Sequence, residues 1–243
     1  MTKSADAAVV GDKILLELSR PFALNGREHH LSASLGICVY PEDGQSVEAM
    51  LRNADMAMYR AKAEGGGQYA FFEERMNAQV LDRLALEIDL RSAVVNKELM
   101  LYFQPQYDLR DGRMVSAEGL VRWSHSKRGF VMPGDFISVA EESGLIVPMG
   151  QWVIRAACRQ LRAWQGGGVS VPRIAVNVSA RQLRAPDFID SVAAIIAETG
   201  IGADLLEIEL TESALMDPDP HRIEELHRLR ALGRCLRPHA SRG

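Results

Sequence analysis

The stretch SAEGLVRWSHSKRG, from Ser116 to Gly129, reads as a strand that carries charged residues among apolar ones. At the strand period of two, Glu118, Leu120 and Arg122 share one face, and the small or apolar residues between them share the other. A strand at the protein surface would turn these charges toward water. A strand that lines a cleft would turn them toward a ligand, and the rest of the chain is needed to decide between the two.

The composition is that of a globular protein. The chain has 243 residues, of which 47% are hydrophobic and 25% charged, and its formal net charge is −4. This length suits one large or two smaller domains, and the acidic balance disfavours binding to a nucleic-acid polymer. No apolar run reaches the ~18 to 20 residues of a membrane span, and no signal-peptide pattern is present. Cys38, Cys158 and Cys235 are widely spaced, so we expect free thiols in a reducing cytoplasm.

Residues 1–76 form the first expected segment. The patterns predict a helix over Asp6–Leu18, a strand over His30–Pro41, a helix over Val47–Glu64 with Ser46 as its N-cap, and a short strand at QYAFF, residues 68–72. These few elements make a poor hydrophobic core by themselves.

Residues 77–233 open with an expected helix over Ala78–Asn96 and then alternate strands with helices. The expected strands are Met100–Gln104, Val115–Trp123, Arg173–Ser179 and Leu205–Thr211, and the expected helices are Gly134–Glu142, Pro148–Gln165, Pro186–Glu198 and His221–Leu232. Such alternation with short connections predicts parallel βα units. The last residues, 234–243, are polar and contain Pro238, so we expect a disordered tail.

Polar residues recur near the C-terminal ends of these strands, namely Gln104, Glu118, Asn177 and Glu209. When helices cover one face of parallel strands, the other face points into a barrel or cleft, so these side chains are expected to converge. Carboxylate and amide oxygens suit a hard divalent cation such as Mg2+ or Mn2+, and Arg122 offers a guanidinium for a phosphate. Taken singly, each residue is better explained by a structural role, such as a buried Glu–Arg pair or an Asn bonded to neighbouring backbone. The coincidence of four such placements at strand ends favours the site instead.

Five segments then occur in order, Gln104-Pro105, EGLVRW, PGDFISVAEESGLI, VNVSARQL and IELTES. They resemble the successive motifs of the EAL phosphodiesterase family, which hydrolyses cyclic di-GMP to pGpG on a modified TIM barrel. The resemblance implies an α/β fold with an incomplete TIM-like (β/α) barrel over residues 77–233. It also implies that Glu118, Asn177 and Glu209 ligate Mg2+ or Mn2+, and that Gln104 and Arg122 contact the dinucleotide.

Residues 1–76 resemble the C-terminal part of a GGDEF diguanylate cyclase domain, through SRPF, SASLGICVYPEDG and LRNADMAMYRAKAEGGGQYAFF. The resemblance implies a cyclase-palm-like α/β segment in a bacterial tandem GGDEF–EAL signalling protein, with Lys62 as a vestigial contact to the GTP phosphates. The GGDEF signature and the metal-binding acids of the first cyclase strand do not occur in the chain, and Gly66 stands where an arginine assists Lys62. No cyclase activity is therefore expected.

The EAL segment also departs from its family. Gly119 stands where the motif has alanine, and the DDFG strand, the catalytic lysine and a later glutamate do not follow Gly233. These departures imply a truncated chain, as a frameshift would produce, with an incomplete active site and weak metal binding. A poorly active phosphodiesterase, a degenerate cyclic di-GMP receptor or scaffold, and a non-functional fragment all stay open. The open barrel edges imply self-association or a covering partner.

Overall fold

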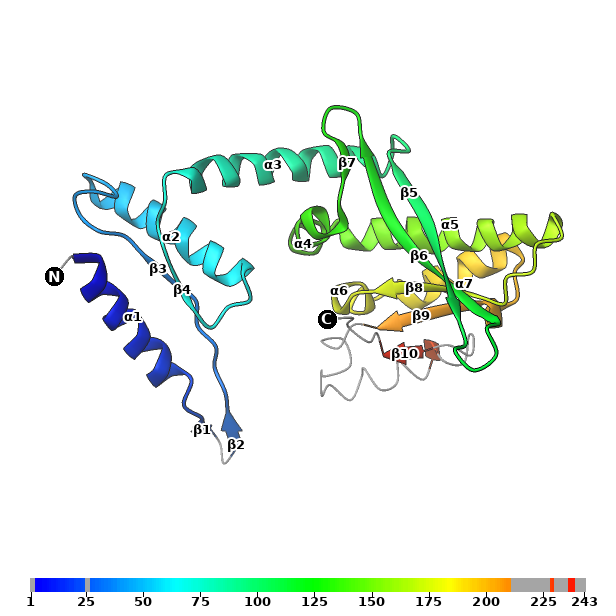
Figure 1. Cartoon of the computed structure of the whole chain (residues 1–243), viewed down its shortest axis with the longest axis horizontal. Helices are drawn as coiled ribbons and strands as arrows, with labels where there is room; N and C mark the ends of the chain where they lie inside the picture. Colours follow the sequence, from blue (N-terminus) through cyan, green and yellow to red (C-terminus); the bar gives the residue numbers. More distant parts are fainter. Residues whose placement is uncertain (1–2, 25–26, 211–227, 230–235, 239–243) are drawn as a thin grey trace. The chain divides into compact units, whose positions relative to one another are not determined.

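The computed structural model describes residues 3–24, 27–210, 228–229 and 236–238. They form a mixed α/β fold that separates into two compact units, Met1–Ala85 and Leu86–Gly243, and the strands of each unit pair only with one another (Figure 1). Within the described part of the chain, no helix is long and apolar enough to cross a membrane.

The first unit contains two short two-stranded sheets, in which β1 is antiparallel to β2 and β3 is parallel to β4. Its elements are α1 (Lys3–Leu18), β1 (Phe22–Leu24), β2 (Arg27–His29), β3 (Leu35–Ile37), α2 (Val47–Ala63), β4 (Tyr69–Phe71) and the first part of α3 (Arg75–Ala93). The strand expected over His30–Pro41 is wrong in extent. Only Leu35–Ile37 have ladder partners, because the facing strand, β4, is equally short.

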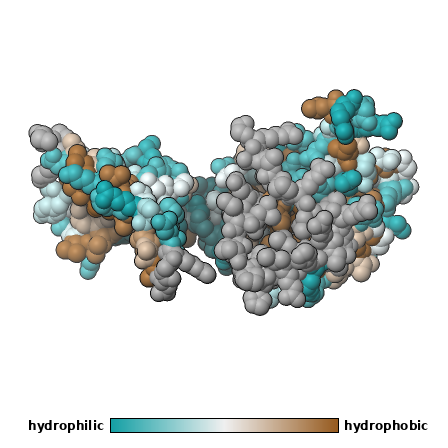
Figure 2. Space-filling view, turned by 90° about the horizontal axis from the view of Figure 1, so that it is seen from below, coloured by the Kyte–Doolittle hydropathy of each residue, from teal (hydrophilic) through white to brown (hydrophobic). Residues whose placement is uncertain are grey.

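Helix α2 begins where the sequence predicts, since the Ser46 hydroxyl accepts a hydrogen bond from the Ala49 N–H. The helix lies directly on β3. A Cβ atom on Gly36 would stand 1.8 Å from the Ala54 carbonyl oxygen, so only glycine allows this approach. Hydrophobic side chains lie among hydrophilic ones on the surface of this unit (Figure 2), and Val10 and Leu16 of α1 are exposed.

The second unit is built on one sheet with the order β10-β9-β8-β6-β5. Strand β7 pairs with the last residues of β6, beyond the part that pairs with β8. Its elements are the rest of α3, β5 (Leu99–Tyr107), β6 (Met114–His125), β7 (Gly129–Val131), α4 (Pro133–Ser143), α5 (Ile146–Gly166), β8 (Ile174–Val178), α6 (Ala180–Leu183), α7 (Phe188–Thr199), a 3-10 turn (Ala203–Leu205), β9 (Leu206–Leu210) and β10 (Leu236–Pro238).

The prediction of parallel βα units is correct for β6, β8 and β9 and wrong for β5, which is antiparallel to β6. The segment between Tyr107 and Met114 is too short for a parallel crossover, which takes about a dozen residues or more. It forms a hairpin turn instead, in which Gly112 adopts a φ of 69°.

The expected disordered tail also needs a correction. Leu236–Pro238 form β10, which pairs in parallel with β9 and bonds to its edge. Leu236 begins this strand, and Pro238 ends it because proline has no N–H to continue a ladder. Of the helix expected over His221–Leu232, Arg228 and Leu229 are helical, and its other residues lie outside the described ones.

The core of the second unit lies between the sheet and its helices (Figure 1). One face of β8 and β9 packs against α5 and α7 through these buried side chains: Leu161, Ile174, Val176, Val178, Phe188, Val192, Leu206, Ile208 and Leu210. The predicted docking of the apolar strand face on helices is thus confirmed. Cys158 of α5 lies in the same core, where burial raises the pKa of its thiol to about 11, and both it and Cys38 are free.

Candidate active site

The polar residues near the strand ends lie on the uncovered face of the sheet, meaning the face that α5 and α7 do not cover. The register sets Gln104 opposite Glu118 across β5 and β6, and Asn177 opposite Glu209 across β8 and β9. Glu118 is opposite Ala175, two residues before Asn177. Because side chains alternate along a strand, the four polar residues share one face, as the period-two pattern predicts.

Glu118 and Asn177 are in direct contact. The Asn177 amide nitrogen Nδ2 donates to Glu118 Oε1 at 2.9 Å, which confirms the predicted proximity of these two side chains. Because the NH2 group faces the carboxylate, the amide oxygen Oδ1 must face elsewhere. That oxygen is buried and has no hydrogen-bond partner among the described residues. A buried acceptor of this kind is uncommon, since most such atoms are paired.

The other oxygen of Glu118 meets Gln106, a residue that the sequence analysis missed. Gln106 Nε2 lies 3.5 Å from Glu118 Oε2, and Gln106 Oε1 accepts from the Ser116 hydroxyl at 2.5 Å. The signal was present, because Gln106 follows Gln104 by one strand period and therefore points to the same face. Gln104 itself is exposed.

Two carboxylates of β9 lie on this face. Glu209, opposite Asn177, is 8% exposed, and Glu207, one strand period earlier, is 1% exposed. Arg173 Nη1 is 3.6 Å from Glu207 Oε2, so this pair lies toward the N-terminal end of the strand. The more C-terminal carboxylate, Glu209, is the one beside the Glu118–Asn177 contact.

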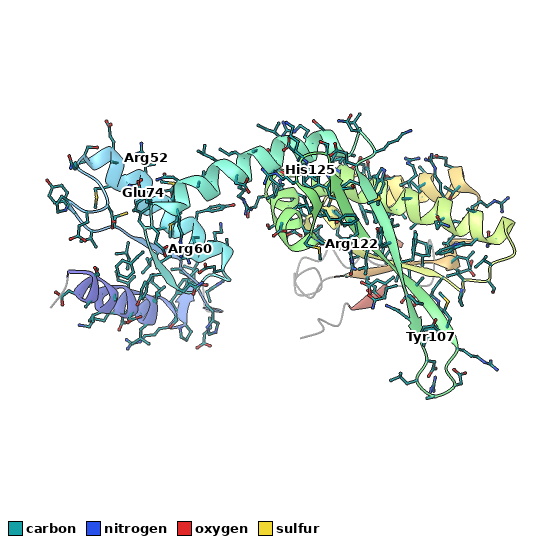
Figure 3. The ribbon with its side chains drawn as sticks, turned by 45° about the horizontal axis from the view of Figure 1, so that its top comes forward. Arg52, Arg60, Glu74, Tyr107, Arg122 and His125 are labelled. Atoms are coloured by element: carbon teal, nitrogen blue, oxygen red, sulfur yellow. The ribbon has the colours of Figure 1, made fainter. Side chains whose placement is uncertain are left out.

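Arg122, labelled in Figure 3, belongs to β6. It follows Glu118 by four residues, so the two share a face of the strand. Its guanidinium carbon is 5.9 Å from the centroid of the Tyr102 ring, and Nη1 donates to the Val121 carbonyl at 2.9 Å. These contacts hold the guanidinium while leaving most of its donors for a ligand such as a phosphate.

A cavity of about 200 Å3 lies beside these residues. Its wall includes Leu120, Arg122, Met149, Gly150, Asn177 and Gln182. The wall therefore combines apolar side chains with a guanidinium and two amides. This mixture suits a ligand with both a flat apolar part and an anionic part.

The donor set fits a hard divalent cation in part. A buried amide oxygen without a partner, beside a carboxylate and in register with a second one, is the oxygen chemistry that Mg2+ and Mn2+ prefer. Among the described residues, no three carboxylate, imidazole or thiolate groups lie close enough together to hold a metal ion. A metal site here would therefore also need the Asn177 amide oxygen.

Lys62 lies in the first unit and is exposed near the C-terminal end of α2. Gly66, which follows this helix, has a φ of 68°, a conformation that favours glycine over the arginine expected there from the family pattern.

Two family models match the chain. Residues 87–235 match the EAL domain, and residues 1–68 match the diguanylate cyclase GGDEF domain. The chain is 40% identical over 229 residues to the bifunctional diguanylate cyclase/cyclic di-GMP phosphodiesterase MucR of Pseudomonas aeruginosa, a match that covers 94% of this chain and 33% of MucR. It is 39% identical over 232 residues to the cyclic di-GMP phosphodiesterase PdeR of Escherichia coli, covering 96% of this chain and 35% of PdeR. The chain thus spans about a third of the length of these curated relatives.

Solved structures show the same likeness. The PaMucR phosphodiesterase in complex with c-di-GMP is 36% identical, with a TM-score of 0.60 over 65% of this chain and 66% of that one. The EAL enzyme Bd1971 in its cAMP- and cyclic-di-GMP-bound form is 26% identical, with a TM-score of 0.60 over 80% of this chain and 51% of that one.

Proposed function

Because the chain belongs to the EAL domain family, we propose that it binds cyclic di-GMP on the uncovered face of β5, β6, β8 and β9 and contributes ligands for its metal-assisted hydrolysis to pGpG. The observation that carries this proposal is the buried Asn177 side-chain oxygen, which lies beside the Glu118 carboxylate and has no partner among the residues that the structure describes. The phosphodiesterase names of MucR and PdeR support the same reaction.

In this proposal Glu118, Asn177 and Glu209 hold Mg2+ or Mn2+. The bound cation would neutralise charge on the phosphodiester and lower the pKa of the attacking water. Glu118 keeps the Asn177 amide oriented by accepting its NH2 group, so that Oδ1 stays available. Arg122 binds a phosphate of the dinucleotide, and Gln104, at the exposed end of the face, contacts the nucleotide.

A cyclic di-GMP receptor without turnover is the second candidate. It is favoured by the cavity with Arg122 on its wall, since recognition of a phosphate and a flat base needs no metal. It is favoured also by the scarcity of carboxylate, imidazole and thiolate ligands noted among the described residues.

The domain limits remain part of the proposal, with residues 1–76 as the C-terminal part of a GGDEF domain, 77–233 as the N-terminal half of an EAL domain and 234–243 outside the family. Lys62 is proposed as a vestigial contact to GTP phosphates in a segment without cyclase activity. We propose a cytoplasmic location, because three widely spaced cysteines suit a reducing compartment. A second copy or another partner would cover the open edges of the sheet.

The test measures metal binding, nucleotide binding and turnover on one preparation of the 243-residue chain. Mn2+ binding is followed by electron paramagnetic resonance, cyclic di-GMP binding by calorimetry, and pGpG by chromatography. Glu118→Gln should weaken Mn2+ binding about 100-fold, or about 2.7 kcal/mol, since it removes a charged ligand. Asp111→Asn is the matched control, because Asp111 lies in the hairpin turn, where it accepts from the Arg113 N–H and pairs with the Arg113 guanidinium.

Release of pGpG that requires Mn2+ and Glu118 supports the phosphodiesterase. Nucleotide binding that depends on Arg122 without pGpG release supports the receptor. Failure of the folded chain to bind either Mn2+ or cyclic di-GMP would overturn both and leave a non-functional fragment.

A further inference from the structure

Helix α5 approaches the end of β8 at one glycine. A Cβ atom on Gly150 would lie 1.8 Å from Gln182 Nε2 and 2.7 Å from Gln182 Cδ, so any side chain there would force the Gln182 amide to move. Both residues are buried and both line the cavity that Asn177 lines. The absence of a side chain at position 150 therefore sets where the Gln182 amide can lie.

Gln182 in turn closes the connection that leaves β8. Its Oε1 accepts from the Ser179 N–H at 3.0 Å, and the Ser179 hydroxyl accepts from the Gln182 N–H at 3.3 Å. These reciprocal bonds make a capping box at the start of α6. Ser179 follows Asn177 by two residues, so the box fixes the backbone immediately after the residue whose amide oxygen has no partner in the described part of the chain.

We propose that Gly150 and Gln182 are positioning residues for Asn177: the α5 backbone holds the Gln182 amide, and the amide fixes the end of β8 so that Asn177 Oδ1 faces the ligand. The inference rests on the proposed function, since it assigns the metal or ligand contact to Asn177. In this inference both residues act on Asn177 through the capping box.

The geometry explains why a small displacement matters. Ligand groups must be held within about 0.5 Å of their working position, and this accuracy comes from the packing around them. Among the described residues, the Asn177 side chain makes one hydrogen bond, to Glu118, so its remaining freedom is set by its own backbone. Loss of such outer supports typically lowers metal affinity about 10- to 100-fold.

The experiment is a double-mutant cycle on the full chain with Gly150→Ala, Gln182→Ala and the double variant. Each single change should weaken Mn2+ binding about 10- to 100-fold. The double variant should be no weaker than Gln182→Ala, because the added methyl then has no amide to displace. Gly166→Ala is the control on the same helix, since nothing lies within 4 Å of its Cβ position, and it should leave Mn2+ affinity unchanged.

A second readout needs no metal. The side-chain NH2 signal of Asn177, assigned by its loss in Asn177→Asp, should move in nitrogen-15 spectra of Gly150→Ala and Gln182→Ala and stay in place in Gly166→Ala. Gln182→Ala adds no atom to α5. If Gly150→Ala prevents folding, the Asn177 signal in Gln182→Ala therefore tests whether Gln182 positions Asn177.

The outcomes separate the inference from the proposed function. An unmoved Asn177 signal, or additive losses of Mn2+ affinity in the double variant, would overturn the inference. Mn2+ binding that is insensitive to both Glu118→Gln and Asn177→Ala would instead overturn the proposed metal site, and the amide signal would still decide whether Gly150 and Gln182 position Asn177.

Discussion

The two faces of the sheet formed by β5, β6, β8 and β9 differ in what their side chains contact. On the helix-covered face, Ile174, Val176 and Ile208 are almost wholly buried against α5 and α7. On the uncovered face, Glu118 and Asn177 contact each other, and an amide oxygen is left without a partner among the described residues. One face therefore contributes stability through apolar burial, and the other keeps polar groups whose burial stabilises the fold little.

The largest expected effect lies on the helix-covered face. Phe188→Ala removes a side chain that is 2% exposed at the start of α7, so it should lower the free energy of unfolding by about 3–5 kcal/mol. Chemical denaturation measures this value. If Asn177→Ala, on the other face, lowered the free energy of unfolding as much as Phe188→Ala, the two faces would not differ in their contribution to stability.

Asn177→Ala should show the reverse pattern. It removes the proposed ligand oxygen and should weaken Mn2+ binding about 100-fold, or about 2.7 kcal/mol, while changing the unfolding free energy by about 1 kcal/mol or less. Paramagnetic resonance and denaturation on the same sample give both values. Wild-type Mn2+ affinity in this variant would remove Asn177 from the site.

Gln106→Leu should have a smaller effect on the same face. The Gln106 amide orients Glu118 from a distance of 3.5 Å, so its loss should weaken Mn2+ binding about 10-fold, the lower limit for an outer support. Gln104→Leu serves as the matched change on the same strand. It should leave Mn2+ affinity alone and weaken only cyclic di-GMP binding, and equal effects of the two variants would contradict this division.

The smallest expected effect concerns Gly119, on the helix side of β6. A Cβ atom there would lie 3.4 Å from the Ala175 carbonyl oxygen and from Leu101, which is ordinary contact. Gly119→Ala should therefore stabilise the chain by about 0.5 kcal/mol, since glycine within a strand weakens it. A loss of stability in thermal denaturation would show that the backbone at this position needs glycine.

Much of this comparison could be predicted from the sequence. Period-two alternation separates the polar from the apolar residues of each strand, and docking of the apolar faces on helices then assigns Glu118, Asn177 and Glu209 to one face. The direction of β5 could not be derived from alternation, which is the same for parallel and antiparallel strands. Only the short connection before Met114 carries that information.

The support around the site was harder to predict. The Ser179-x-x-Gln182 spacing is a recognisable capping signal, so Gln182 could have been found as a helix start. The close approach of the Gln182 side chain to Gly150 could not be predicted, since it depends on how α5 packs against the connection after β8. Likewise, the hydrogen bond to Glu118 comes from Gln106, which is opposite Ser116, and not from Gln104, which is directly opposite Glu118. Alternation alone does not choose between these two glutamines, because both lie on the same face.

The antiparallel pairing of β5 with β6 has a consequence for the order in which the polar face assembles during folding. Glu118 and Gln106 are separated by 12 residues along the chain, whereas Glu118 and Asn177 are separated by 59. Closing the longer loop costs about 1.4 kcal/mol more chain entropy, and local contacts form faster than distant ones. The hairpin can thus hold the Glu118 carboxylate in place before β8 arrives, so that the arrival of Asn177 is the slow step that completes the pair.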